Sequence, residues 1–336
     1  MAVVRMRDVA QLASVSVTTV SHVINKTRAV DPETRARVLD AIARTGYRKN
    51  SIALALAKGG TQSVGVALSA LSNPYFAELV TAIEARVSEL GSTLLLGETH
   101  EDAEREYDLV TKLLDRRVDG VVLAPTANGT DTALDALVRS GVPAVLVDRL
   151  VAPDRFDQVG SDNREPVATL VDHLVGHGHR RIGYVAGRSG LATSIERRQG
   201  YDDGLTRNGI APDPALVVDG GSDGTLAGQA MRRLWELTSR PTAVITGNNY
   251  MTVGVLRHLE HAGIVVPDDL ALCGFDDFEW AELMRSPLTA IAQDWTAIGT
   301  TAVGMLRDRL AEPDRPFETV RIPATLIVRR SCGCSG

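Results

Sequence analysis

The 336-residue sequence lacks several features that would place it in a large class of proteins. No apolar run approaches the roughly 20 residues of a membrane-spanning helix. The first residues, MAVVRMRDVA, contain neither an extended apolar core nor a cleavage-like site. Only three cysteines are present, a number that suits a reducing compartment. We therefore expect a soluble cytoplasmic protein that makes no membrane contact.

Catalytic signatures are missing as well. The sequence has no Walker loop, no G-x-G-x-x-G motif after a predicted strand and no nucleophile elbow. His173, His177 and His179 resemble metal ligands at first, but we interpret HGHRRIGYVAG as a helix end that leads into a strand. The Cys332-Gly-Cys334 tail could bind a metal, but residues 331–336 are predicted to be unstructured. We expect no enzyme activity, no metal and no cofactor.

Charge is distributed unevenly along the chain, whose net charge is −6. Residues 1–60 contain ten Lys and Arg against four Asp and Glu, a local charge of +6 that leaves −12 for the remainder. A small basic module on an acidic body is the pattern expected when a phosphate-binding domain is joined to a soluble effector domain. A chance asymmetry remains the alternative.

The segment from Met6 to Asn25 reads as two short helices with a turn at Ser14-Val15. Ser16 can cap the second helix because its hydroxyl can accept a free backbone N–H. That helix is expected to bury Val20, Val23 and Ile24, and the first helix Val9, Ala10, Leu12 and Ala13. The opposite face of the second helix is polar and carries no acid, as is typical of a helix that enters the major groove of DNA. An ordinary helical hairpin with a polar surface explains the segment equally well.

A third helix is predicted from Asp31-Pro32 to Gly46, because Asp is a good N-cap, Pro suits the first helical position and Gly ends helices. Val38, Leu39 and Ile42 are expected to pack against the first two helices. After residue 62, apolar strands alternate with amphipathic helices, which predicts two doubly wound parallel sheets that bind ligands at the carboxyl ends of their strands. The predicted strands are 64–68, 93–97, 120–124, 144–148, 182–186, 215–219, 243–247, 270–275 and 325–329.

The segments VAQLASVSVTTVSHVIN and VDPETRARVLDAIARTGY resemble the amino-terminal domain of the LacI/GalR family of bacterial transcription regulators. The resemblance implies a small all-α helix-turn-helix domain (1–49), a hinge (50–61) and an α/β two-lobe domain of the periplasmic-binding-protein type (62–330). The first lobe would comprise about 62–161 and 293–322, and the second about 162–292 and 323–330, with crossings near Asp162, Gln293 and Pro323. It also implies a repressor that binds double-stranded, pseudo-palindromic operator DNA as a homodimer and responds to a small-molecule effector.

The same resemblance assigns candidate DNA contacts. Val17, Thr18 and His22 match the main specificity positions, and Leu56 matches a leucine that wedges into a minor-groove base step. Lys49 and Leu54 depart from the family pattern, which often has proline and arginine there. The complete set of predicted DNA contacts is Ser16, Val17, Thr18, Thr19, Ser21, His22, Asn25, Ala53 and Leu56.

Candidate effector contacts follow at the strand ends. They are Tyr75, Phe76, Asp148, Arg149, Arg197, Asn249, Asp276 and Trp295, with Gln293 as a weaker candidate. Asn249 stands where the family usually has aspartate. The family often has an aromatic residue in the segment that corresponds to DGGSDGTLAG, which has none here, and Trp295 or Trp280 would take its place. An internal Arg197–Asp276 salt bridge is the alternative for that pair. A sugar is the expected effector, with a nucleoside or purine as the alternative, and a solute-binding protein of the transport class is a second interpretation of the whole chain.

Overall fold

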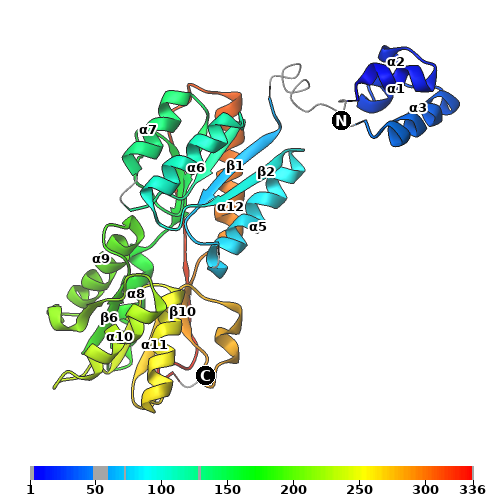
Figure 1. The fold of residues 1–336 in the computed structure, drawn as a ribbon. Helices are drawn as coiled ribbons and strands as arrows, with labels where there is room; N and C mark the ends of the chain where they lie inside the picture. The colour runs from blue at the N-terminus through cyan, green and yellow to red at the C-terminus, as the bar shows by residue number, and fades with distance from the viewer. Residues whose placement is uncertain (1–3, 48–59, 72, 128–129, 335–336) are drawn as a thin grey trace. The chain divides into compact units, whose positions relative to one another are not determined.

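A computed structural model describes residues 4–47, 60–71, 73–127 and 130–334 (Figure 1). It divides into two compact units, Met1–Thr61 and Gln62–Gly336. The predicted hinge contacts Ala53 and Leu56, and the departures Lys49 and Leu54, lie outside the described residues. Within the described residues, no helix is both long and apolar enough to cross a membrane.

The first unit is a three-helix bundle made of α1 (Met6–Ala13), α2 (Val17–Asn25) and α3 (Pro32–Thr45). Local capping sets its boundaries: Ser16 Oγ accepts the Thr19 N–H at 3.0 Å, and Asp31 Oδ2 accepts the Thr34 N–H at 3.1 Å. Gly46 ends α3 in the left-handed conformation. The bundle has a small apolar core of Val9, Ala10, Ala13, Val20, Val23, Val38 and Ala41.

The prediction that Leu12 and Leu39 are buried in this core is wrong. Leu12 and Leu39 keep 42% and 49% of their surface exposed. Leu39 directly follows the buried Val38, and successive residues point about 100° apart around a helix, so the Leu39 side chain lies beside the buried face of α3.

The first lobe of the second unit is built on an all-parallel sheet in the order β11-β5-β4-β3-β1-β2. Helices α5 (Pro74–Glu89) and α12 (Trp295–Ala311) pack together on one side, and α6 (Ala103–Asp115) and α7 (Thr130–Ser140) pack on the other, around separate apolar clusters. The strands are β1 (Ser63–Leu68), β2 (Thr93–Glu98), β3 (Gly120–Leu123), β4 (Ala144–Val147), β5 (Asp157–Ser161) and β11 (Thr319–Ile322).

The second lobe repeats the plan with the order β12-β10-β9-β8-β6-β7, in which only β12 is antiparallel among the described strands. Helices α8 (Arg164–Gly176) and α9 (Ala192–Arg207) form one layer, and α10 (Gly224–Trp235) and α11 (Asn249–Ala262) form the other (Figure 1). The strands are β6 (Ile182–Ala186), β7 (Val217–Asp219), β8 (Ala243–Thr246), β9 (Ala271–Phe275), β10 (Thr289–Ala292) and β12 (Thr325–Ile327).

The chain passes between the lobes three times, at 162–163, 293–294 and 323–324, where β5, β10 and β11 end. These three strands, and helix α12, are absent from the predicted elements. Residues Asp157–Ser161 and Thr319–Ile322 carry too few large apolar side chains to read as buried strands, yet β5 is wholly buried. The expected strand 215–219 begins as a 3₁₀ turn, Pro214–Leu216, because proline cannot donate to a ladder.

The prediction of an unstructured tail is also wrong for residues 331–334. Ser331 and Cys332 are fully buried. Leu272 N–H donates to Ser331 O at 2.8 Å, Thr289 N–H donates to Ser331 Oγ at 2.8 Å, and Ser331 N–H donates to Pro287 O at 2.9 Å. These bonds tie the tail to the second lobe beside β9 and β10.

Candidate functional site

The outer face of α2 presents the predicted base-reading residues. Val17 is 46% exposed and Thr18 is also exposed, whereas Ser21, His22 and Asn25 are partly buried. His22 Nδ1 and Thr27 Oγ1 form a hydrogen bond of 2.8 Å, so Nε2 is the ring nitrogen left for a base edge. Asn25 Nδ2 donates to Ser21 Oγ at 3.1 Å, which orients the amide along the helix. The face therefore offers one fully apolar side chain, Val17, and several hydrogen-bonding groups.

A cavity of about 220 Å³ lies between the two lobes of the second unit. Its lining comes from the segments that follow the strands of both sheets and from helices α5, α9 and α11, and it is mostly polar. The residues are Ser69, Ala70, Asn73, Phe76, His100, Glu101, Asp148 and Arg149 from the first lobe, and Arg188, Leu191, Thr193, Ser194, Arg197, Gly221, Ser222, Gly247, Asn248, Tyr250, Asp276 and Gln293 from the second lobe and its crossing segment.

Two aspartates occupy matching places in the two sheets. Asp148 follows β4 and Asp276 follows β9, and each of these is the third strand in its sheet order. Both have left-handed backbones, with φ of 66° and 72°, and both are almost fully buried. A left-handed backbone costs a non-glycine residue conformational free energy, and such strained residues are concentrated at ligand sites. The geometry brings a carboxylate from each lobe to the cavity.

Arg197 reaches the cavity from α9 and is 6% exposed. Its Nε donates to Asn163 Oδ1 at 2.8 Å, its Nη1 donates to the Gly247 carbonyl at 2.7 Å, and its guanidinium lies 3.6 Å from the Phe275 ring centre. Among the described residues, Nη2 donates to no protein group. The protein therefore fixes the guanidinium plane and leaves one nitrogen for a ligand.

Asp276 is held by neutral donors. Gln293 Nε2 donates to its Oδ1 at 2.6 Å, and Asn249 N–H donates to its Oδ2 at 3.3 Å. Burial raises the pKa of Asp276, and the Arg197 charge and the two hydrogen bonds oppose that rise. Among the described residues, Arg197 and Asp276 form no ion pair with each other, so the expected alternative of a structural pair does not hold.

Arg149 is bound mainly by the protein itself. Its guanidinium donates to both carboxylate oxygens of Glu101, to the Pro125 carbonyl at 2.6 Å and to Ser69 Oγ at 3.2 Å. It also lies 3.3 Å from an Asp148 oxygen. Because this many bonds hold the side chain in place, its geometry suits positioning Asp148 and Glu101 at the cavity wall.

Polar contacts also join the lobes directly. Asn249 Nδ2 donates to Asn73 Oδ1 at 2.7 Å, and both residues are buried. Arg321 forms a bidentate pair with Glu196, with N–O distances of 2.6 and 3.1 Å. These bonds hold the present pose of the lobes, and a ligand that competes with them would change it.

The structure places most predicted effector residues at this cavity. Phe76, Asp148, Arg149, Arg197, Asp276 and Gln293 line it. Asn249 stands behind the lining, bonded to Asn73, and the Tyr75 side chain lies outside the described residues. Trp295 is not among the lining residues, because it begins α12 and packs into the first-lobe core. Trp280 lies at a different surface of the second lobe.

Several lining residues were not predicted. His100 and Glu101 follow β2, Arg188 follows β6 and Ser222 follows β7. Each lies just beyond the carboxyl end of a strand, so the strand-end rule could have found them. They were not predicted because no recognisable sequence motif surrounds them.

Comparisons with known proteins agree with this geometry. The family described as bacterial regulatory proteins, lacI family, matches residues 5–50, and the periplasmic binding protein-like domain matches residues 171–332. The HTH-type transcriptional repressor PurR of Mannheimia succiniciproducens is 34% identical over 97% of this chain and 98% of its own length. The chain belongs to the LacI family.

Solved structures of this family show the same architecture. A lac repressor dimer bound to operator and the anti-inducer ONPF has 28% identity and a TM-score of 0.86, covering 98% of this chain and 99% of that one. A transcriptional regulator CelR–cellobiose complex has 29% identity and a TM-score of 0.75 over the same shares. The predicted family and fold class are thereby confirmed.

Proposed function

We propose that this LacI-family DNA-binding transcriptional repressor is controlled by a small polyhydroxylated effector, of the size of a sugar, bound between its lobes. The observation that carries the proposal is the polar cavity of about 220 Å³, lined by Asp148, Asp276 and Arg197. Carboxylates accept hydroxyl hydrogens and a guanidinium donates to hydroxyl oxygens, so a ligand with both kinds of group satisfies them all. Phe76 offers an apolar face for a ring.

The size of the cavity supports a compact ligand. It is smaller than the roughly 300–1,000 Å³ of sites for drug-sized molecules. A solved family member, at 29% identity, is a complex with cellobiose. A nucleoside or purine is the alternative, since a base edge also pairs with carboxylate and amide groups.

On the DNA side, the proposed form is a homodimer that presents two α2 helices to the half-sites of a pseudo-palindromic operator. The solved lac repressor relative is a dimer on its operator. Val17 can contact a thymine methyl, and His22 replaces the arginine common in the family, so a bidentate guanine contact is lost. Sedimentation analysis with and without operator tests the dimer, and a monomer on DNA would contradict it.

Switching would follow from the lobe contacts. A ligand at Arg197 and Asp276 lies beside the Asn73–Asn249 bond, so binding changes the relative free energies of lobe poses. The pose would then determine whether the hinge engages DNA. Leu56→Ala should remove the minor-groove wedge and cost about 1–3 kcal/mol of operator affinity. Unchanged bending in a circular-permutation gel would contradict the hinge part of the proposal.

The effector test is a thermal-shift screen of monosaccharides, disaccharides, nucleosides and purines, because a ligand that binds only the folded state raises its stability. Hits are titrated calorimetrically and then added to gel shifts on the protein's own upstream DNA. A sugar that binds and changes operator affinity supports the proposal. A nucleoside or purine hit establishes the alternative, and ligand binding without any DNA binding would favour a solute-binding protein.

A further inference from the structure

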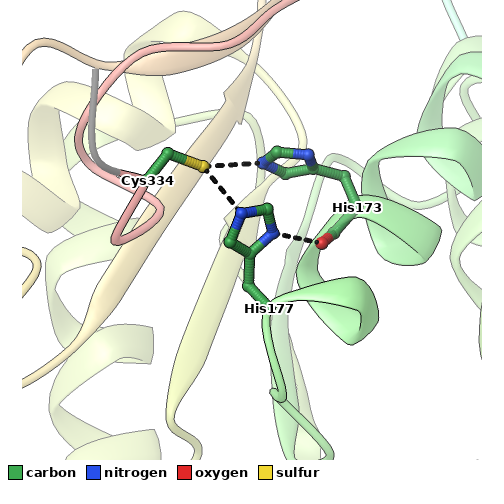
Figure 2. Close-up of side chains that lie close together, drawn as sticks. All are labelled: His173, His177 and Cys334. Atoms are coloured by element: carbon green, nitrogen blue, oxygen red, sulfur yellow. Dashed lines mark hydrogen bonds between the residues drawn. The ribbon is translucent and has the colours of Figure 1, made fainter.

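The docked tail brings together three side chains that are far apart in the sequence. His173 lies in the last turn of α8, His177 caps that helix, and Cys334 comes from the carboxyl-terminal tail (Figure 2). Cys334 Sγ lies 3.4 Å from His173 Nε2 and 3.2 Å from His177 Nε2. One donor atom from each of the three residues falls within 4.8 Å of the other two. None of the three residues lines the interlobe cavity.

We propose that His173, His177 and Cys334 form a binding site for a thiophilic divalent transition metal, with Zn²⁺ as the first choice. Zinc binds sulfur at about 2.3 Å and imidazole nitrogen at about 2.0–2.1 Å, so a tetrahedral ion places S and N donors about 3.5 Å apart. The two S···N distances of 3.2 and 3.4 Å are within a few tenths of an ångström of that value. Two imidazoles and a thiolate are also the donor types that select zinc over Mg²⁺ or Ca²⁺.

The tautomer of His177 supports this assignment. Its Nδ1 lies 2.8 Å from the His173 carbonyl oxygen, as the dashed line in Figure 2 shows. A carbonyl oxygen can only accept, so Nδ1 carries the proton and the neutral ring keeps its lone pair on Nε2, the atom nearest the sulfur. Metal-ligating histidines usually donate their other N–H to such an acceptor, which fixes the ring orientation.

The fold, rather than the cluster itself, holds the sulfur in place. Ser331 is bonded to Leu272, Thr289 and Pro287, and Cys332 is buried in the second-lobe core. Contacts within the protein therefore place the tail beside the end of α8. Cys332 Sγ lies 2.7 Å from Cys334 Sγ, which is shorter than the separation of about 3.8 Å between two sulfurs on one tetrahedral zinc ion, so water is the expected fourth ligand. His179 is engaged elsewhere, by Thr242 Oγ1 at 2.9 Å, and is not a proposed ligand.

The cluster of His173, His177 and Cys334 is accessible to solvent. His177 is exposed, and His173 and Cys334 are partly buried, so an ion can enter from solvent. A bound ion would join residues 157 or more positions apart in the chain and pin the tail to α8.

The test uses tag-free, full-length protein, reduced and handled without oxygen. Titration with Co²⁺ should give a thiolate-to-metal charge-transfer band and the strong visible absorption of a tetrahedral ion, saturating at one ion per chain. Added Zn²⁺ should bleach both features and raise the melting temperature. Absence of the charge-transfer band would overturn the proposal.

Variants locate the site. His173→Gln, His177→Gln and Cys334→Ser should each weaken Zn²⁺ binding by more than the roughly 10–100-fold typical of losing an outer-shell partner. His261→Gln, an exposed histidine on α11, is the matched control and should bind like the unmodified chain. Circular dichroism and operator binding check that each variant is folded. Unchanged affinity in all three ligand variants would place the metal elsewhere and overturn the assignment.

Thiol titration tests whether Cys332 and Cys334 form a disulfide, which would prevent metal binding. Three reactive thiols in the denatured, reductant-free protein are expected. If two are missing until a phosphine reductant is added, Cys332 and Cys334 form a disulfide in the protein as it exists, and the proposal fails.

Discussion

Replacing Arg197 by alanine should separate ligand binding from folding in the second unit. In the structure the guanidinium satisfies Asn163 Oδ1 and the Gly247 carbonyl and leaves Nη2 for the effector. The variant leaves an acceptor on the ligand unpaired, which costs about 1–3 kcal/mol, or roughly 5–150-fold in affinity. Two protein acceptors also lose a partner, but they border a cavity that admits water, so we expect a stability loss at the low end of about 1–3 kcal/mol.

The assay is calorimetric titration of the effector found in the screen, alongside urea denaturation without it. Arg207→Ala is the matched control, because Arg207 lies on the same helix and pairs with Glu165 and Asp172 at the surface. Exposed ion pairs contribute little to stability, so this control should leave both measurements nearly unchanged. Wild-type effector affinity in Arg197→Ala, together with lowered stability, would show that Arg197 is purely structural and would refute the site.

Three further predictions follow from particular contacts. His22→Ala should relax operator choice, whereas Arg35→Ala should only lower overall affinity; equal losses on all operator variants would contradict this. Burial raises the pKa of Glu106 from 4.5 to about 7, so between these pH values the carboxyl group is ionised in the unfolded state and still protonated in the folded state. The free energy of unfolding should therefore fall by on the order of 3 kcal/mol as the pH rises from 4.5 to 7. Glu106→Gln should abolish that fall in denaturation curves recorded across this pH range. Asp157→Ala should cost about 3–5 kcal/mol of unfolding free energy by stranding the buried Arg309, and a loss below 1 kcal/mol would argue against a buried charge pair.

Much of the architecture is encoded locally and can be predicted from the sequence. The Ser16 and Asp31 caps act on N–H groups three residues ahead, and the apolar period of α2 repeats every turn. The predicted strands that the structure contains are short apolar runs with turn residues beside them. The three-helix unit and most of both sheets could be predicted because neighbouring residues determine these features. Family resemblance added candidate positions around the cavity, and six of the nine proposed residues line it.

Tertiary structure decided what depends on distant neighbours. Strand β5 is mostly polar and β11 is half polar, and both exist because the chain crosses between lobes and completes one sheet. Trp295 looked available to a ligand, but helix α12 buries it in the first-lobe core. Cys334 meets His173 and His177 only because Ser331 and Cys332 dock on the second lobe. Side-chain pairs separated by more than 150 residues carry no local signal, since the backbone path between them sets their distance.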